Sequence, residues 1–196
     1  MPARSHLPKR IVLTGGPGAG KSVIARAIVE QNPDRFLLVP EAATQVYAML
    51  NTRWDRLDVE GRCDVQRRIY HLQRGQEDRL AREHIDRIHI LDRGTIDGAA
   101  YWPEGADDYW RNLGTTHDAE LDRYDAAIWL ESAAALGLYD GDGSNICRFE
   151  NAAGAVASGK LLLRLWGGHP TLMHVRAFND LDHKIAAVHE LVARFA

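Results

Sequence analysis

Eight consecutive residues, GGPGAGKS, have a composition and spacing that suit the binding of phosphate groups. Glycine adopts positive φ at little cost, so successive backbone N–H groups of such a segment can point at the same phosphate oxygens. Lys21 would bring a charge to the β- and γ-phosphates, and the Ser22 hydroxyl would ligate Mg²⁺. The segment therefore predicts a binding loop for a nucleoside triphosphate with Mg²⁺, formed by Gly15, Gly16, Pro17, Gly18, Ala19, Gly20, Lys21 and Ser22.

The flanking residues decide between this interpretation and a glycine-rich turn without a ligand. The β-branched run at 11–13 stops at glycine, as a buried strand does. Val23, Ile24, Ala27 and Ile28 then recur on one face of a helix that starts within the loop. A strand before the loop and a helix after it are the context that a phosphate-binding loop (P-loop) requires, and the helix dipole adds a positive end.

An aspartate and an arginine follow the third expected strand, at 88–91. In a parallel sheet this end of the strand lies beside the phosphate loop, at the edge where ligands bind. Asp92 would hold Mg²⁺, usually through water, and the alternative is an exposed strand-end carboxylate. Arg93 would clamp a phosphoryl group or stabilise the transferring charge, and its alternative is a surface ion pair.

Glu41 closes the second expected strand, at 36–39, and should face the same cleft. A carboxylate there would bind substrate hydroxyls or act as the general base that accepts a proton from the attacking hydroxyl. An acid at this position also suits the first turn of a helix, because the helix dipole favours negative charge there. These interpretations of Glu41 stay open at the level of the sequence.

Residues 137–147 are glycine-rich and polar, which is typical of a surface loop. Arg148 follows this loop and precedes a leucine-rich helical segment at 161–165. In P-loop kinases such a segment closes over the phosphates, and an arginine in it stabilises developing charge. We therefore expect a lid at about 137–160 with Arg148 as its catalytic arginine; the alternative is a plain surface arginine.

Strands and helices alternate along the chain, which predicts a parallel sheet covered on both faces. We expect an α/β protein with a three-layer P-loop NTPase fold, a five-stranded parallel sheet and a small lid, in one domain of residues 1–196. Residues 101–120 are expected to form an irregular excursion, with a short helix capped between Thr115 and Asp118. The other expected elements are a long helix, two strands and a final helix, at 59–84, 126–130, 172–175 and 180–195.

The composition is that of an ordinary soluble protein and argues against several classes. The formal net charge of −3 provides no basic field for nucleic acid or an acidic membrane. The two cysteines, Cys63 and Cys147, suggest neither a disulfide framework nor a zinc site. No stretch approaches the roughly 18 apolar residues of a membrane span, and the N-terminal apolar run is too short for a signal peptide. We expect a cytoplasmic protein without a nucleic-acid partner or a membrane span.

The segments TGGPGAGKS, VPEAA, LDRG-x-x-DG-x-AY, YDAAIWLE and RFEN together resemble one P-loop family over nearly the whole chain. This family groups the ribosylnicotinamide kinase domain of the bacterial NAD regulator with the insect protein needed for light-driven movement of a TRP-like channel. Thymidylate and deoxynucleoside kinases are more distant relatives. The resemblance implies a sheet with the phosphate-loop strand at its centre and nucleobase contacts from 177–180. It also implies the site roles described above for Lys21, Ser22, Glu41, Asp92, Arg93 and Arg148.

The sequence therefore predicts an ATP- and Mg²⁺-dependent kinase that phosphorylates a hydroxyl of an unidentified small nucleoside-like or other metabolite. The alternative is an ATPase or GTPase switch that acts through a protein or lipid partner. A nucleic-acid-dependent NTPase is disfavoured by the acidic net charge. The absence of a guanine-selecting NKxD string favours ATP, with GTP as the other candidate nucleotide.

Overall fold

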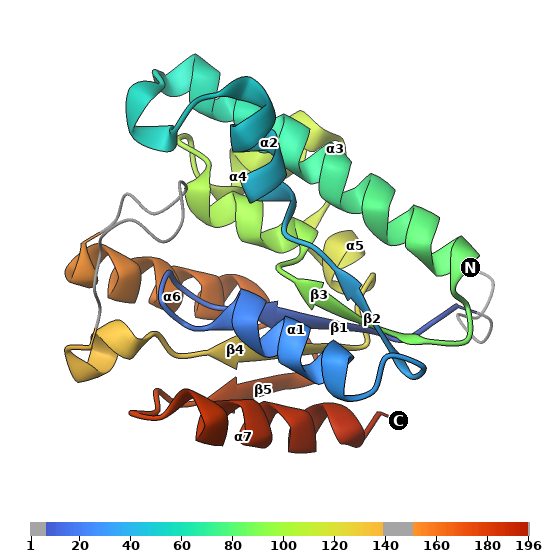
Figure 1. The fold of residues 1–196 in the computed structure, drawn as a ribbon. Helices are drawn as coiled ribbons and strands as arrows, with labels where there is room; N and C mark the ends of the chain where they lie inside the picture. Colours follow the sequence, from blue (N-terminus) through green and yellow to red (C-terminus); the bar gives the residue numbers. More distant parts are fainter. Residues whose placement is uncertain (1–6, 139–150, 196) are drawn as a thin grey trace.

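Five parallel strands form the centre of the protein in a computed structural model that describes residues 7–138 and 151–195. The strand order is β2-β3-β1-β4-β5, so the first strand of the chain is the central strand of the sheet (Figure 1). The predicted α/β class, the five-stranded parallel sheet and the central position of the phosphate-loop strand are confirmed. The strands are β1 Arg10–Thr14, β2 Phe36–Val39, β3 Ile88–Asp92, β4 Ala126–Leu130 and β5 Leu172–Val175.

Helices connect these strands, because parallel neighbours must be joined by crossover connections. No helix within the described ranges is long and apolar enough to cross a membrane. The α-helices are α1 Lys21–Gln31, α2 Ala42–Leu50, α3 Val59–Glu83, α4 Ala106–Leu113, α5 His117–Leu121, α6 Ala152–Trp166 and α7 Leu181–Ala193. Short 3₁₀ helices are η1 Trp54–Arg56, η2 Thr95–Tyr101 and η3 Ala133–Leu136.

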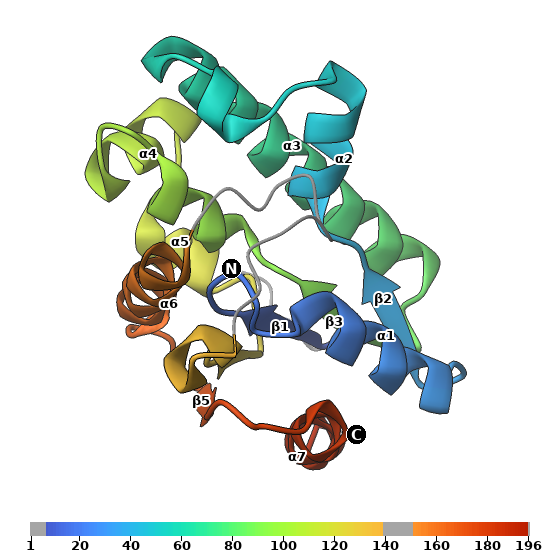
Figure 2. The ribbon, with the colours of Figure 1, turned by 60° about the vertical axis from the view of Figure 1, so that its left-hand side comes forward.

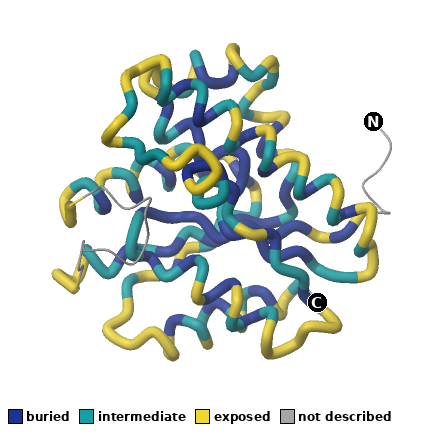
Figure 3. Tube along the Cα trace, turned by 45° about the horizontal axis from the view of Figure 1, so that its top comes forward, coloured by how far each residue is buried: buried dark blue, intermediate teal, exposed yellow. Residues whose placement is uncertain are grey.

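Side chains alternate along a strand, so β1 contributes to a core on each face of the sheet. Ile11 and Leu13 face α1 and α7, whereas Val12 faces the opposite side. On that side, Tyr70 of α3 and Trp166 of α6 belong to a second core that also includes residues of α4 and α5. Figure 2 shows these two helical layers, and Figure 3 shows the buried sheet between exposed outer surfaces.

The segment 101–120 is mostly helical, which corrects the expectation of an irregular excursion. Helix α4 forms there because rings such as that of Tyr109, which is 1 % exposed, are buried in the second core. The N-cap of α5 is Thr116 rather than Thr115, since the Thr116 hydroxyl accepts a hydrogen bond from the Ala119 N–H at 3.2 Å. The sequence does carry a helical pattern for α4, because apolar residues recur at i, i+3, i+4 and i+7 as Ala106, Tyr109, Trp110 and Leu113.

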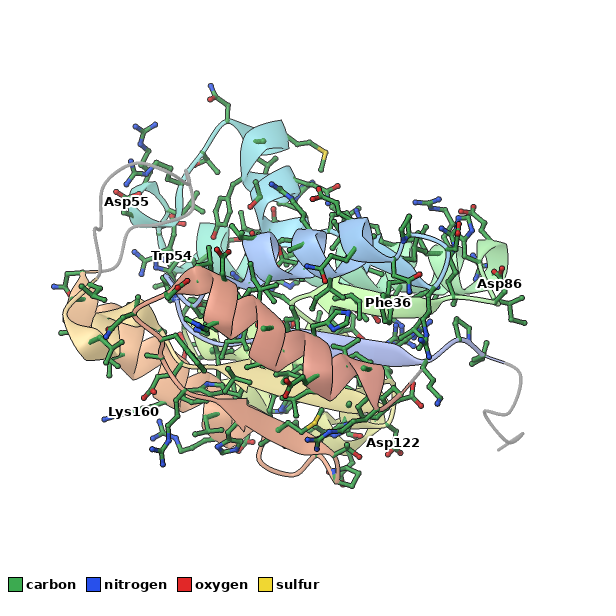
Figure 4. All side chains as sticks on the ribbon, turned by 60° about the horizontal axis from the view of Figure 1, so that its bottom comes forward. Phe36, Trp54, Asp55, Asp86, Asp122 and Lys160 are labelled. Carbon is green, nitrogen blue, oxygen red and sulfur yellow. The ribbon has the colours of Figure 1, made fainter. Side chains whose placement is uncertain are left out.

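The carboxyl ends of the strands bring the predicted site residues to one edge of the sheet. Leu13 of β1 pairs with Asp92 of β3, so Asp92 lies next to the start of the phosphate loop. Figure 4 shows Trp54 at this end of the molecule, and Phe36, where β2 begins, at the other end.

Candidate functional site

The loop between β1 and α1 has backbone conformations that favour glycine. Gly15 has a φ of 133°, and a Cβ atom added there would lie 2.2 Å from the Leu130 carbonyl oxygen. Gly20 has a φ of 85° and precedes α1, where unpaired N–H groups and the helix dipole favour an anion. The loop therefore presents an anion-binding helix start on a backbone that larger residues would distort.

Lys21 is buried in this loop and contacts the loop itself. Its Nζ atom donates hydrogen bonds to the carbonyl oxygens of Gly15 and Gly16, at 2.7 and 2.9 Å. Burial lowers the pKa of Lys21 to about 7; the charge of Arg93 adds to this effect, and nearby carboxylates oppose it. A phosphate group would stabilise the charged form of this amine, so the site favours an anionic ligand.

Asp92 lies at the end of β3 and is 4 % exposed. Burial raises the pKa of its carboxyl, as does the charge of Glu41, whereas a hydrogen bond from Ser22 acts in the opposite direction. Its Oδ1 atom has no hydrogen-bond partner among the described residues. A buried oxygen without such a partner, next to a serine hydroxyl, fits the oxygen ligands that Mg²⁺ takes directly or through water.

Arg93 has a φ of 76°, an unusual conformation for a residue with a side chain. Such a conformation costs about 1–2 kcal/mol, which surrounding contacts must offset. The Nε atom donates to Glu41 Oε1 at 2.6 Å, and Nη1 donates to Asp97 Oδ2 at 3.0 Å. Because all three side chains are at most 16 % exposed, these are buried pairs rather than surface ion pairs.

Glu41 precedes α2, and its carboxylate is shared between two partners. Oε1 pairs with Arg93, and Oε2 accepts a hydrogen bond from the Thr44 hydroxyl at 2.6 Å. The side chain makes no capping hydrogen bond to the backbone of α2. Burial would raise the pKa of Glu41, but Arg93 and Thr44 outweigh it and hold the pKa below its ordinary value. The carboxylate is therefore ionised at neutral pH.

Asp97 belongs to the same cluster and was not among the site residues predicted from the sequence. It is 3 % exposed, and its Oδ1 atom accepts hydrogen bonds from Thr14 Oγ1 at 2.9 Å and Trp166 Nε1 at 2.8 Å. The available signal was an acid four residues after Arg93 in the LDRG-x-x-DG segment. The 3₁₀ helix η2 turns this acid back toward the end of β3.

A pocket extends from the phosphate loop past Glu41 and Arg93 toward α2 and α3. Gln66 of α3 lines it and is 4 % exposed. Walls of this kind suit a planar or apolar small molecule whose polar groups meet a few fixed partners. Much of the wall is aromatic, formed by Tyr47, Trp54, Tyr70, Tyr101 and Tyr109.

Arg148 and most of the expected lid loop lie outside the described residues. Of the expected lid, the structure describes 137–138 and 151–160. Helix α6 begins there after Asn151, whose side chain accepts a hydrogen bond from the Gly154 N–H at 2.8 Å. The catalytic role of Arg148 stays a prediction.

A parallel sheet of this strand order, with a phosphate-binding loop after its central strand, defines the P-loop NTPase class of protein. Within this class, the sequence model of the AAA domain family matches residues 10–175, and the chain belongs to this family. A comparison with curated proteins gave no match.

Several solved structures share the fold. A NadR protein in complex with NAD and AMP-PNP aligns with a TM-score of 0.61 and 16 % identity, over 95 % of this chain. The alignment covers 50 % of that relative, so this chain spans half of its length. A thymidylate kinase from Candida albicans aligns with a TM-score of 0.65 and 15 % identity, and the alignment covers 96 % of this chain and 92 % of that kinase.

A deoxyadenosine kinase from M. mycoides, with dCMP and dCDP bound, has a TM-score of 0.66 and 14 % identity, covering 94 % of this chain and 99 % of its own. At these identities the likeness shows the fold alone. It confirms the resemblance of the chain to P-loop kinases.

Proposed function

We propose that this protein is an ATP- and Mg²⁺-dependent kinase that phosphorylates a hydroxyl of a small nucleoside-like or other metabolite. One observation carries the proposal: the Glu41 carboxylate and the Arg93 guanidinium line the same pocket as Lys21, and aromatic walls extend beyond them. A hydroxyl bound against these walls would lie between a proton acceptor and the phosphate loop. The thymidylate and deoxyadenosine kinases among the structural neighbours support a reaction of this type.

In the proposed reaction, Glu41 accepts the proton of the acceptor hydroxyl as the hydroxyl oxygen bonds to the γ-phosphorus. The bond from the γ-phosphorus to the bridging oxygen breaks, and its electron pair leaves with ADP. Lys21 and Arg93 offset negative charge on the phosphoryl oxygens. Mg²⁺ bound by Ser22 and Asp92 would neutralise further charge on the β- and γ-oxygens.

A nucleotide-hydrolysing switch is the main alternative, but it requires neither an acceptor pocket nor a carboxylate at its edge. The aromatic walls and the paired Glu41 therefore favour transfer over hydrolysis. We also propose ATP rather than GTP as the donor, because the guanine-selecting NKxD string is absent.

Product analysis with γ-labelled ATP and a panel of nucleosides and small hydroxyl compounds tests the proposal. We expect at least one compound to become labelled, in equal amount to the ADP formed. The Lys21→Ala protein, purified in parallel, controls for contaminating kinases, and γ-labelled GTP tests donor choice. If free phosphate were the only labelled product and a protein partner changed its rate of release, the kinase proposal would be wrong.

A further inference from the structure

Helix α6 contacts two parts of the site that lie far apart in the sequence. Near its start it packs against the phosphate loop, where a Cβ atom added to Gly16 would lie 2.3 Å from the Ala155 carbonyl oxygen. At its last residue, the fully buried Trp166 donates a hydrogen bond from Nε1 to Asp97 Oδ1 at 2.8 Å. A single helix thus connects the phosphate loop with the carboxylate that pairs with Arg93.

The Asp97 carboxylate uses one oxygen for support and the other for the arginine. Oδ1 accepts hydrogen bonds from Thr14 and Trp166, and Oδ2 accepts from Arg93 Nη1 at 3.0 Å. Two donors on Oδ1 fix the plane of the carboxylate, and this gives Oδ2 a defined position. The Trp166 ring also packs beside Gly94, where an added Cβ atom would lie 3.0 Å from the ring. The Trp166 ring therefore also restricts the backbone at Gly94, the residue that follows Arg93.

This support matters most when Glu41 changes its charge. Glu41 holds Arg93 from the other side at 2.6 Å, but as a general base it becomes neutral during transfer. A hydrogen bond to a neutral carboxyl is weaker than one to a carboxylate. Asp97 accepts no proton in the proposed step, so its hydrogen bond from Arg93 Nη1 persists while the hydrogen bond to Glu41 weakens.

We propose that Asp97 and Trp166 are positioning residues that hold Arg93 against the reacting phosphoryl group. Through them, α6 couples the phosphate loop to the arginine. The catalytic consequence rests on the proposed kinase function, whereas the holding of Arg93 is a property of the protein without substrate.

Two variants and a matched control test the proposal. Trp166→Phe keeps a buried ring but removes the N–H donor, and Asp97→Asn keeps the shape but removes the charge. Trp102→Phe is the control, because Trp102 lies in the same core and donates from Nε1 to a different carboxylate, Asp108 Oδ2, at 2.9 Å. The two tryptophan variants each remove one indole–aspartate hydrogen bond, whereas Asp97→Asn removes the negative charge that pairs with Arg93.

The first measurement is hydrogen exchange at the Nη–H groups of Arg93, which include the Nη1 donor that Asp97 holds, by ¹⁵N-edited NMR with the signals assigned by their loss in Arg93→Lys. We expect exchange to speed up about tenfold or more in Trp166→Phe and Asp97→Asn, and to stay within about twofold in Trp102→Phe. Equal exchange in all three variants would show that Trp166 and Asp97 only fill the core, and would overturn the proposal.

The second measurement is transfer to an identified acceptor. We expect kcat to fall about tenfold to hundredfold in Trp166→Phe and Asp97→Asn, with the ATP dissociation constant within about twofold of wild type. Neither substitution should lower kcat further in an Arg93→Ala background. Faster exchange without loss of transfer would also overturn the proposal. If the wild type phosphorylates no acceptor, the kinase function itself fails, and background ATP hydrolysis becomes the second measurement.

Discussion

At the scale of single residues, the choice between transfer and hydrolysis depends on Glu41. Its carboxylate is held by Arg93 and by the Thr44 hydroxyl, each at 2.6 Å, and both contacts keep its pKa low against the effect of burial. The group is therefore charged and oriented before a substrate binds. A hydrolytic site could use the same carboxylate to activate water, so substitution of Glu41 must be read out on transfer and on hydrolysis separately.

Glu41→Gln preserves size and one acceptor oxygen but cannot accept a proton, and it also removes the charge that pairs with Arg93. We expect transfer to an identified acceptor to fall about 10²–10⁴-fold, while background hydrolysis of ATP changes little. Product analysis with labelled ATP measures both rates, and calorimetry should show ATP affinity close to that of the wild type. Intact transfer would mean that Glu41 has a structural role.

Asp92 is the second residue whose role a single substitution can test. Asp92→Asn keeps the side-chain shape but removes the charge next to the buried Oδ1 atom that lacks a described partner. We expect half-maximal turnover to require about tenfold more Mg²⁺, with an unchanged circular dichroism spectrum. The same Mg²⁺ dependence in both proteins would exclude Asp92 from the metal site.

At the scale of elements, two helices from the last quarter of the chain support the phosphate loop. Helix α6 packs against Gly16, as described above. From α7, the buried Lys184 donates hydrogen bonds from Nζ to the carbonyl oxygens of Ala19 and Glu131, at 2.8 and 2.6 Å. The conformation of the loop thus depends on helices that begin more than a hundred residues after it.

Two glycine substitutions separate this packing from intrinsic helix propensity. Gly16→Ala forces a Cβ atom to within 2.3 Å of the Ala155 carbonyl oxygen, so the free energy of unfolding should fall by about 1–3 kcal/mol. Gly75 lies within α3, where an added Cβ atom meets nothing within 4 Å. Gly75→Ala should therefore raise the free energy of unfolding by about 0.5–1 kcal/mol. Urea unfolding measures both, and effects of the same sign would contradict the described packing.

The stability contribution of Lys184 should depend on pH. Burial lowers the pKa of Lys184 from 10.5 to about 8, although the negative charge of Glu131 acts to raise this pKa. Between these pKa values the folded state binds fewer protons than the unfolded state, so rising pH favours folding. In this window, the free energy of unfolding of the wild type should rise with pH, relative to that of Lys184→Met, by up to about 1.4 kcal/mol per pH unit. Urea unfolding at several pH values measures the difference, and a constant difference would contradict the lowered pKa.

At the scale of the whole molecule, a bound nucleotide should stabilise the fold in proportion to its affinity. ATP at about 100 times its dissociation constant should raise the free energy of unfolding by about 2.7 kcal/mol. Lys21→Ala removes charge-assisted phosphate contacts worth about 1.5–3 kcal/mol each, so ATP affinity should fall at least about tenfold. Thermal unfolding should then show a much smaller ATP-induced shift, and an unchanged shift would contradict the role of the loop.

The sequence by itself determined the elements whose signals are local. Hydrophobic runs predicted every strand of the sheet to within one or two residues, and the spacing of Gly15, Gly20 and Lys21 indicated the loop, because both depend on neighbours along the chain. The same local logic failed at 101–120. Apolar residues do recur there at helical spacing from Ala106 to Leu113, but the flanking Pro103, Gly105 and Gly114 favoured a loop. The fold then shows that the aromatic rings of α4 are buried by other elements.

Only the tertiary structure decided which side chains meet. Glu41 and Arg93 are 52 residues apart, and Asp97 and Trp166 are 69 residues apart, yet each pair forms a hydrogen bond. A hydrophobic pattern shows that a residue is buried but carries no information about its partner. The partner follows from strand order and from the direction in which each helix crosses the sheet. For this reason, the sequence predicted Arg93 as a site residue, and the fold showed the contacts that hold it.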